Sequence, residues 1–218
     1  MNAHTVLQTV PGPAGRIACA IDAPAGPSLG VAVVCHPHPQ HGGTMDNKVV
    51  QTLARAFVQL GWRSVRFNFR GVGESEGAWD EGRGEVEDAL AVVASFMAAS
   101  MAEPKAGSAA PALLMAGFSF GGYVAAEVAA RLPSAERPQT LVLVGPSTQK
   151  QALPAVPPGT VVIHGESDDV VPLSSTLDWA RPQALPVIVF PGVGHFFHGQ
   201  LGLLKSVVLQ QLQGRPAS

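Results

Sequence analysis

The segment Leu113-Leu114-Met115-Ala116-Gly117-Phe118-Ser119-Phe120-Gly121-Gly122 runs from apolar residues into a serine bracketed by glycines, and an alanine-rich run follows it. The pattern G-x-S-x-G predicts a strand that turns sharply into a helix, with Ser119 at the apex. Gly117 and Gly121 suit this turn because a Cβ at either position would collide where the strand and helix backbones approach. The turn would lift the Ser119 hydroxyl off the sheet, beside the amides of a helix N-terminus. Ser119 is therefore a candidate nucleophile.

Length and composition fit one domain that spans residues 1–218. The chain is 46% hydrophobic and 14% charged, with a formal net charge of −2. A chain of this composition is not disordered, and without a basic patch it does not suit a nucleic-acid binder. No apolar run reaches the roughly 20 residues that a membrane helix needs. We therefore expect neither nucleic acid nor a membrane as a partner, and the sequence leaves the oligomeric state undetermined.

Three further features bear on the cellular compartment and on the loops. Met1 to Thr5 show neither the charged nor the apolar region of a signal peptide. Cys19 and Cys35 fall in predicted strands, as buried reduced thiols of cytoplasmic proteins do, although their spacing also permits a disulfide. We therefore expect a cytoplasmic protein. The segment from Ala102 to Pro111 is rich in Ala, Pro, Gly and Ser, and it predicts a loop.

Apolar runs that predict strands alternate with segments of helical periodicity from residue 30 onward. The predicted strands are Thr5–Val10, Arg16–Ile21, Gly30–Cys35, Ser64–Phe69, Leu113–Phe118, Thr140–Val144, Thr160–His164 and Pro186–Phe190. The first two form an antiparallel hairpin. The later strands are apolar throughout rather than alternating, which indicates a mostly parallel sheet covered by helices on both faces.

Side chains suited to nucleophilic catalysis follow three of the predicted strands. In chain order the candidates are Ser119, then Asp168 or Asp169, then His195 or His198. The carboxyl ends of parallel strands meet at one edge of a sheet, so we expect these groups to lie close together. A serine hydroxyl needs an imidazole to accept its proton, and that imidazole needs a carboxylate to orient it. The order Ser, Asp, His on a strand–helix repeat favours this arrangement.

Five motifs between about residues 30 and 200 resemble those of the α/β-hydrolase superfamily. They are His36-Pro37-His38-Pro39 with Gly42-Gly43-Thr44-Met45-Asp46-Asn47-Lys48, Asn68-Phe69-Arg70-Gly71-Val72-Gly73, the Ser119 turn, His164-Gly165 with Asp168 and Val171-Pro172, and His195-Phe196-Phe197. The chain is most similar to the small bacterial serine hydrolases without a lid, the esterase group related to dienelactone hydrolases. The resemblance implies a three-layer fold with about eight strands, the second of them antiparallel. The short Pro-rich interval Gly145 to Gly159 leaves no room for a cap domain.

Carried over by motif, the resemblance makes Ser119 the nucleophile, Asp168 the acid that orients the base, and His195 the base. Asp168 takes the aspartate position of a His-Gly-x-x-Asp-x-x-Val-Pro pattern, and Asp169 is its rival. His195 follows Gly194 as in the Gly-x-His pattern of the superfamily, and His198 is its rival.

An oxyanion hole needs two backbone N–H donors. One is expected from Phe120, the residue after the nucleophile, and the other from the loop after Cys35. Because prolines at positions 37 and 39 have no N–H, His38 is the expected second donor. Gln40 and His41 remain alternatives.

Other notable residues favour structural roles. His36, His38 and His41 do not match a helical zinc motif, so we expect no metal site. For Arg70 an ion pair is favoured over binding of a substrate carboxylate, and for His164 a hydrogen bond at the strand end. Phenylalanines near the predicted site could line an acyl pocket or belong to the core; they are Phe118, Phe120, Phe196 and Phe197.

The resemblance thus implies an enzyme that cleaves carboxylic esters through an acyl-enzyme on Ser119, without cofactor or metal. A site without a lid suits small or exposed acyl groups, so the expected partner is a small-molecule ester. A serine at the turn argues against the cysteine and aspartate nucleophiles of dienelactone hydrolases and dehalogenases. A thioesterase or a small-peptide hydrolase would use the same three residues. A noncatalytic binding protein on this fold is the alternative from another class.

Overall fold

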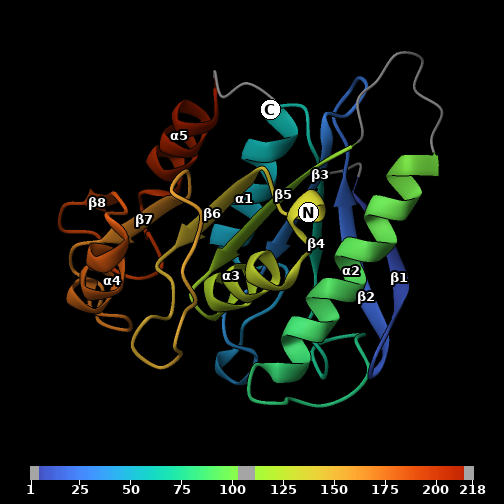
Figure 1. Ribbon diagram of the computed structural model, residues 1–218, viewed down its shortest axis with the longest axis horizontal. Helices are drawn as coiled ribbons and strands as arrows, with labels where there is room; N and C mark the ends of the chain where they lie inside the picture. The colour runs from blue at the N-terminus through green and yellow to red at the C-terminus, as the bar shows by residue number, and fades with distance from the viewer. Residues whose placement is uncertain (1–4, 103–110, 214–218) are drawn as a thin grey trace.

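The computed structural model describes residues 5–102 and 111–213, and Figure 1 shows a central sheet between two layers of helices. Eight strands lie in the order β1-β2-β4-β3-β5-β6-β7-β8. They are β1 (Val6–Gly12), β2 (Gly15–Asp22), β3 (Gly30–Cys35), β4 (Arg63–Phe67), β5 (Ala112–Phe118), β6 (Thr140–Val144), β7 (Val161–Gly165) and β8 (Val187–Phe190). β2 is antiparallel to both of its neighbours, and the pairs from β4 to β8 are parallel. The predicted α/β fold with an antiparallel second strand is confirmed.

The described residues form five α-helices, and α2 with α3 and α1 with α5 cover opposite faces of this sheet (Figure 1). They are α1 (Lys48–Gln59), α2 (Arg83–Ala102), α3 (Phe120–Arg131), α4 (Leu173–Ala180) and α5 (Leu201–Leu212). The apolar residues of α2 and α3 form one core with one face of the sheet, and those of α1 and α5 form a second core on the other face. Every residue of β3 is buried, as its unbroken apolar run predicts.

Six of the eight predicted strands differ from the observed ones by one or two residues at one or both ends, and only β3 and β6 have the predicted bounds. The strand predicted to end at Phe69 ends at Phe67, because the next two residues turn toward a neighbouring loop. The Asn68 side chain accepts a hydrogen bond from the Met45 amide (2.8 Å), and the Phe69 amide donates to the ring of His36 (3.0 Å). β7 begins and ends one residue later than predicted.

The connection between β6 and β7 contains no cap. Residues 145–160, all of which the structure describes, include no helix or strand. The strand ends at this side of the sheet are therefore uncovered by a second domain, as predicted.

Both cysteines are buried free thiols, so the disulfide alternative is wrong. Burial raises the pKa of Cys19 to about 12 and also raises that of Cys35. The loop predicted from Ala102 to Pro111 falls mainly on residues 103–110, outside the described residues, as does most of the N-terminal pentapeptide. Within the described ranges, no helix is both long and apolar enough to cross a membrane.

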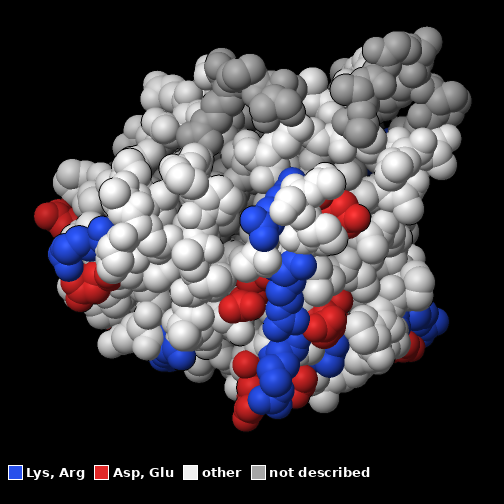
Figure 2. All heavy atoms as spheres, viewed as in Figure 1, with Lys and Arg blue, Asp and Glu red and all other residues white. Residues whose placement is uncertain are grey.

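Positive and negative side chains lie beside one another on the face that carries α2 and α3 (Figure 2). Arg131 pairs with Glu87 at 2.7 Å, and Arg83 pairs with Asp80 at 3.0 Å. Charges on this face are therefore largely matched locally, and most of the rest of this face is uncharged.

Candidate active site

Ser119 lies between the end of β5 and the first turn of α3, as the glycine pattern predicts. Its backbone has φ 56° and ψ −121°, a conformation that residues other than glycine rarely adopt. A Cβ on Gly117 would meet the carbonyl oxygen of Gly121, and a Cβ on Gly121 would meet that of Cys35. Both glycines therefore permit the close approach of strand and helix that holds the serine at the apex.

A hydrogen-bonded chain connects three of the predicted residues, which come from three different strand ends. The Nε2 atom of His195 lies 2.9 Å from Oγ of Ser119, and its Nδ1 lies 2.6 Å from Oδ2 of Asp168. All three side chains are more than 90% buried. If Asp168 is ionised, Nδ1 of His195 carries the proton, which leaves Nε2 free to accept the serine proton.

The surroundings of Asp168 keep it ionised. Burial by itself raises the pKa of this carboxyl, but hydrogen bonds from His164, His195 and the Val171 amide outweigh burial and hold the pKa well below its usual range. Oδ1 accepts from the amides of Val170 (2.9 Å) and Val171 (2.7 Å). A carboxylate with this many donors stabilises the positive charge that His195 acquires during catalysis.

His164 also contacts Asp168, which the sequence did not indicate. Its Nε2 lies 2.9 Å from the carbonyl oxygen of Val171 and 3.3 Å from Oδ2 of Asp168. Since the carbonyl can only accept, Nε2 carries a hydrogen and donates. The predicted structural hydrogen bond of His164 is present, and the same ring supports the carboxylate.

The two rival residues lie outside this chain of hydrogen bonds. Asp169 and His198 are both exposed, and both line a hollow that includes His195 but not Ser119. His198 stacks near Phe196, with ring centroids 5.8 Å apart. The structure therefore brings together Ser119, Asp168 and His195 and leaves both rivals aside.

The loop after β3 carries the expected second oxyanion donor. The amides of Gln40 and His41, the two alternatives, both donate to His38, to its Nδ1 (3.3 Å) and its carbonyl oxygen (3.1 Å). The Gly43 amide donates to the same carbonyl oxygen at 3.0 Å. These bonds fix the backbone of His38, whose ring packs on Trp79 and on Phe120, the other expected donor residue.

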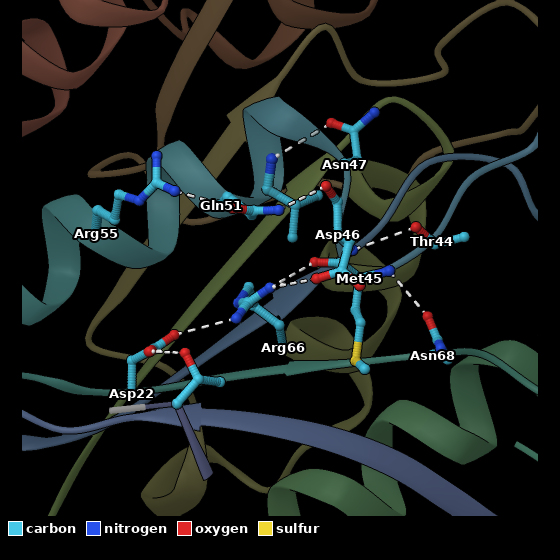
Figure 3. A network of polar contacts seen from close by, with 11 residues as sticks. Asp22, Thr44, Met45, Asp46, Asn47, Gln51, Arg55, Arg66 and Asn68 are labelled. Atoms are coloured by element: carbon cyan, nitrogen blue, oxygen red, sulfur yellow. Dashed lines mark hydrogen bonds and ion pairs between the residues drawn. The ribbon is translucent and has the colours of Figure 1, made fainter. Parts of the chain in front are cut away.

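A buried arginine fastens the end of this loop to the sheet (Figure 3). Arg66, on β4, is 2% exposed. Its Nη1 donates to the carbonyl oxygen of Met45 (3.0 Å) and to the Asp46 carboxylate (3.1 Å), and its Nη2 donates to Asp22 on β2 (3.2 Å). Asn68 holds the Met45 amide from the other side. The segment between His38 and α1 is therefore tied to β4 and its end, and through Arg66 to β2.

His36 supports the start of the same loop from within the core. It is fully buried, its Nδ1 donates to the carbonyl oxygen of Pro37 (2.6 Å), and its Nε2 accepts from the Phe69 amide (3.0 Å). Burial lowers the pKa of His36 from its ordinary value to about 3, which the bond to Pro37 only partly opposes. The ring is therefore neutral, as both bonds require.

A hollow of about 380 Å³ lies beside Ser119. Its lining consists of Pro37, His38, His41, Gly42, Gly43, Asn47, Ser119, Lys150, Val170, His195 and Phe196. Of the four phenylalanines considered for an acyl pocket, Phe196 lines the hollow and is 44% exposed, while the other three are buried in the core. The hollow is of the size of a small-molecule site.

The remaining candidates have structural partners. Arg70 forms a two-pronged ion pair with Asp88, at 2.9 and 2.7 Å, which confirms the ion pair over a substrate contact. Among the residues that the structure describes, no three His, Cys, Asp or Glu side chains are grouped so that they could hold a metal ion.

Residues 32–174, well over half of the chain, match the family described as serine aminopeptidase, S33. The chain belongs to this family of the α/β-hydrolase superfamily. Family membership supports hydrolase activity and does not define the substrate class.

Two solved structures extend the likeness of this α/β-hydrolase over its whole length. An α/β serine hydrolase homologue from Coxiella burnetii is 36% identical, with 97% of this chain and 98% of that chain covered and a TM-score of 0.81. An α/β serine hydrolase without a lid from Xanthomonas campestris is 33% identical, with 100% and 98% covered and a TM-score of 0.86. An uncharacterised protein of Rickettsia prowazekii is 40% identical over 122 residues, which are 56% of this chain and 48% of that relative. The match thus spans about half the length of this curated relative.

Sequence reasoning missed three contributors to the site of this hydrolase: Arg66, Asn68 and Lys150. Arg66 and Asn68 belong to a strand and its end, and their partners lie more than 20 positions away in the chain. Lys150 lies in the Pro-rich connection after β6, where no motif marks it. Asn68 was part of a motif that resembles the superfamily, which is the one signal that could have indicated it.

Proposed function

We propose that this chain is a serine esterase that cleaves small carboxylic esters, with Ser119 as nucleophile, His195 as general base and Asp168 as the acid that orients it. The observation that carries the proposal is the hydrogen-bonded chain from Ser119 through His195 to Asp168, which opens onto a hollow of about 380 Å³. A serine, an imidazole and an ionised carboxylate in this order form the arrangement that activates a hydroxyl toward a carbonyl carbon.

Each step of the proposed reaction uses groups of this chain. Oγ of Ser119 attacks the ester carbonyl carbon while Nε2 of His195 takes the hydroxyl proton. The amides of Phe120 and His38 donate to the oxyanion that forms on the carbonyl oxygen. Collapse of this intermediate breaks the bond to the alcohol oxygen, which receives the proton from His195 and leaves. Water then attacks the acyl-serine while His195 takes its proton. Collapse breaks the bond between the acyl carbon and Oγ, His195 returns the proton to Oγ, and the acid leaves.

The lining of the hollow supports an ester over an aminopeptidase substrate, despite the family's description. The α-ammonium group of an aminopeptidase substrate lies next to the scissile carbonyl and needs an anionic partner there. Among the described residues, no Asp or Glu side chain lines the hollow that contains Ser119, whereas Lys150 does. Asp169 lines only the second hollow, from which Ser119 is absent.

Active-site labelling combined with a substrate panel tests the proposal. The wild type and Ser119→Ala are treated with an alkyl fluorophosphonate and assayed with acyl p-nitrophenyl esters, acyl thioesters and aminoacyl p-nitroanilides. We expect the wild type to be labelled and to cleave the esters fastest, and we expect Ser119→Ala to do neither. Labelling that persists in Ser119→Ala would contradict the assignment of Ser119 as the nucleophile. A wild type that is never labelled would favour a noncatalytic binding protein, and faster cleavage of thioesters or anilides would change the substrate class.

A further inference from the structure

Among the described residues that line the hollow beside Ser119, one has a permanently charged side chain, and it is a cation. Lys150 reaches this hollow from the connection between β6 and β7. The other polar side chains of the lining are the histidines at 38, 41 and 195, with Asn47 and Ser119 itself. The remaining wall is formed by glycines and by apolar side chains, among them Val170 and Phe196, both more than 40% exposed.

The backbone that carries Lys150 is fixed to the nucleophile. The Ser147 amide donates to the carbonyl oxygen of Ser119 (3.1 Å), and the Gln151 amide donates to the carbonyl oxygen of Ser147 (3.3 Å). Between them, the Thr148 hydroxyl lies 2.8 Å from the hydroxyl of Ser175 on α4. Lys150 therefore has a long side chain on a loop that is hydrogen-bonded to Ser119, and both residues line the same hollow.

Within the part of the chain that the structure describes, the ammonium group of Lys150 has no anionic partner. The ion pairs between these residues use an arginine or a histidine, and none uses Lys150. The positive charge of Lys150 also affects His38. Burial lowers the pKa of the His38 ring, and the neighbouring His41 and Lys150 lower it further. An unpaired cation at the edge of a mostly apolar hollow is suited to attract an anionic group of a ligand.

The two hollows that share His195 differ in charge. The second hollow, of about 440 Å³, shares Val170, His195 and Phe196 with the first, and its charged lining residue is Asp169. An anionic substituent is therefore favoured on the side of Lys150 and disfavoured on the side of Asp169.

We propose that the esters cleaved at Ser119 carry an anionic group, such as a carboxylate, which Lys150 binds in the hollow that contains the nucleophile. This inference rests on the proposed esterase function and deepens it by naming the substrate class. The anionic group belongs to either the acyl or the alcohol part of the ester, and both arrangements offer Lys150 the same chemistry.

Two pairs of esters that differ only in charge test the proposal. For the acyl side, the p-nitrophenyl monoester of adipic acid is compared with p-nitrophenyl heptanoate, which has a similar length. For the alcohol side, 4-(butyryloxy)benzoic acid is compared with its methyl ester. The ratio of kcat/KM within each pair is measured at low ionic strength, with spontaneous hydrolysis subtracted, for the wild type, Lys150→Met and Lys150→Glu. Lys205→Met, on α5 and outside both hollows, is the matched control.

We expect the wild type to prefer the anionic ester of at least one pair by about threefold to fivefold, the range that an exposed ion pair allows. Lys150→Met should abolish this preference, Lys150→Glu should invert it, and Lys205→Met should retain it. Added salt should weaken it, because exposed charges are screened.

Labelling by a neutral fluorophosphonate is measured on every variant, because it reports on Ser119 independently of Lys150. A labelled enzyme that cleaves neutral esters with no dependence on Lys150 would overturn the anionic-substrate inference and leave the esterase intact. A preference for anions that survives in Lys150→Glu would also overturn it. A wild type that neither labels nor cleaves any ester would overturn the proposed function and this inference with it.

Discussion

Nη1 of Arg66 lies 3.0 Å from the carbonyl oxygen of Met45, so a side chain from the interior of the sheet holds the loop that follows β3. The same nitrogen reaches Asp46 at 3.1 Å, and the other arm of the guanidinium reaches Asp22. This loop also carries His38, the proposed oxyanion donor. Arg66 therefore links the buried interior of the sheet to the loop that positions the His38 amide.

Replacing Arg66 with Met should lower both stability and turnover. Removing one partner of a buried ion pair leaves an uncompensated charge, here on Asp22, so we expect the free energy of unfolding to fall by about 3 kcal/mol. We expect kcat for a neutral ester to fall by about tenfold, less than the 10²–10³ for complete loss of an oxyanion donor. Urea unfolding and steady-state kinetics measure the two effects.

Two further variants separate positioning by Arg66 from general stability. Arg66→Lys keeps the charge but not the two-pronged geometry, so it should recover stability better than kcat. Asp178→Asn, in a surface pair with Arg181, should change neither quantity appreciably. An unaltered kcat in folded Arg66→Met would contradict the positioning role.

Replacing Asp168 with Asn should reduce kcat by about 10⁴ with little change in KM, because the amide no longer stabilises the proton on Nδ1 of His195. The Asn oxygen can still accept from the amides of Val170 and Val171, so the fold should persist. Asp169→Asn, one residue further and exposed, is the matched control and should keep kcat within about twofold of the wild type. Equal losses in the two variants would argue against the assignment of Asp168.

Replacing Gly121 with Ala should destabilise the protein and abolish activity, because the added Cβ would meet the backbone carbonyls of Cys35 and His36. Gly202, within α5, has no atom within 4 Å of an added Cβ, so Gly202→Ala should stabilise the helix by about 0.5–1 kcal/mol. Thermal unfolding of both variants checks the contrast. Similar melting temperatures for the two would show that β3 does not approach the first turn of α3 as closely as described.

Acid should destabilise the protein through His36 well before the carboxylates titrate. The unfolded chain binds a proton on this residue near pH 6.5, whereas the folded protein binds it only near pH 3. Between these values the unfolded state holds more protons, so stability is complete above about pH 6.5 and falls as the pH drops. The fall should approach about 1.4 kcal/mol per pH unit.

Urea unfolding between pH 7.5 and 4.5 measures this slope. In His36→Gln the slope should be shallower by about the same amount, even though the variant is less stable at pH 7.5. Parallel slopes in the two proteins would assign the acid sensitivity to other groups.

The sequence predicted what local patterns determine. Unbroken apolar runs predicted the buried parallel strands, and the rule that chemistry follows strand ends predicted that Ser119 would meet an aspartate and a histidine from later strand ends. The resemblance to the superfamily selected Asp168 and His195 among them. Arg66 escaped prediction, because an arginine in an apolar run carries no periodic signal and its partners come from β2 and from the loop before α1. Lys150 escaped for a similar reason: its place beside Ser119 depends on how one loop folds back. Contacts made between distant segments have no signature in either segment alone.

The backbone conformation of Ser119, at φ 56° and ψ −121°, lowers the stability of the folded protein at the residue that its activity needs. A serine in this conformation lowers the free energy of unfolding by on the order of 1–3 kcal/mol, and a glycine at this position would avoid that loss. Ser119→Gly should therefore unfold at a higher temperature than the wild type while it hydrolyses nothing. Selection for stability alone would therefore replace this nucleophile among the first residues of the chain.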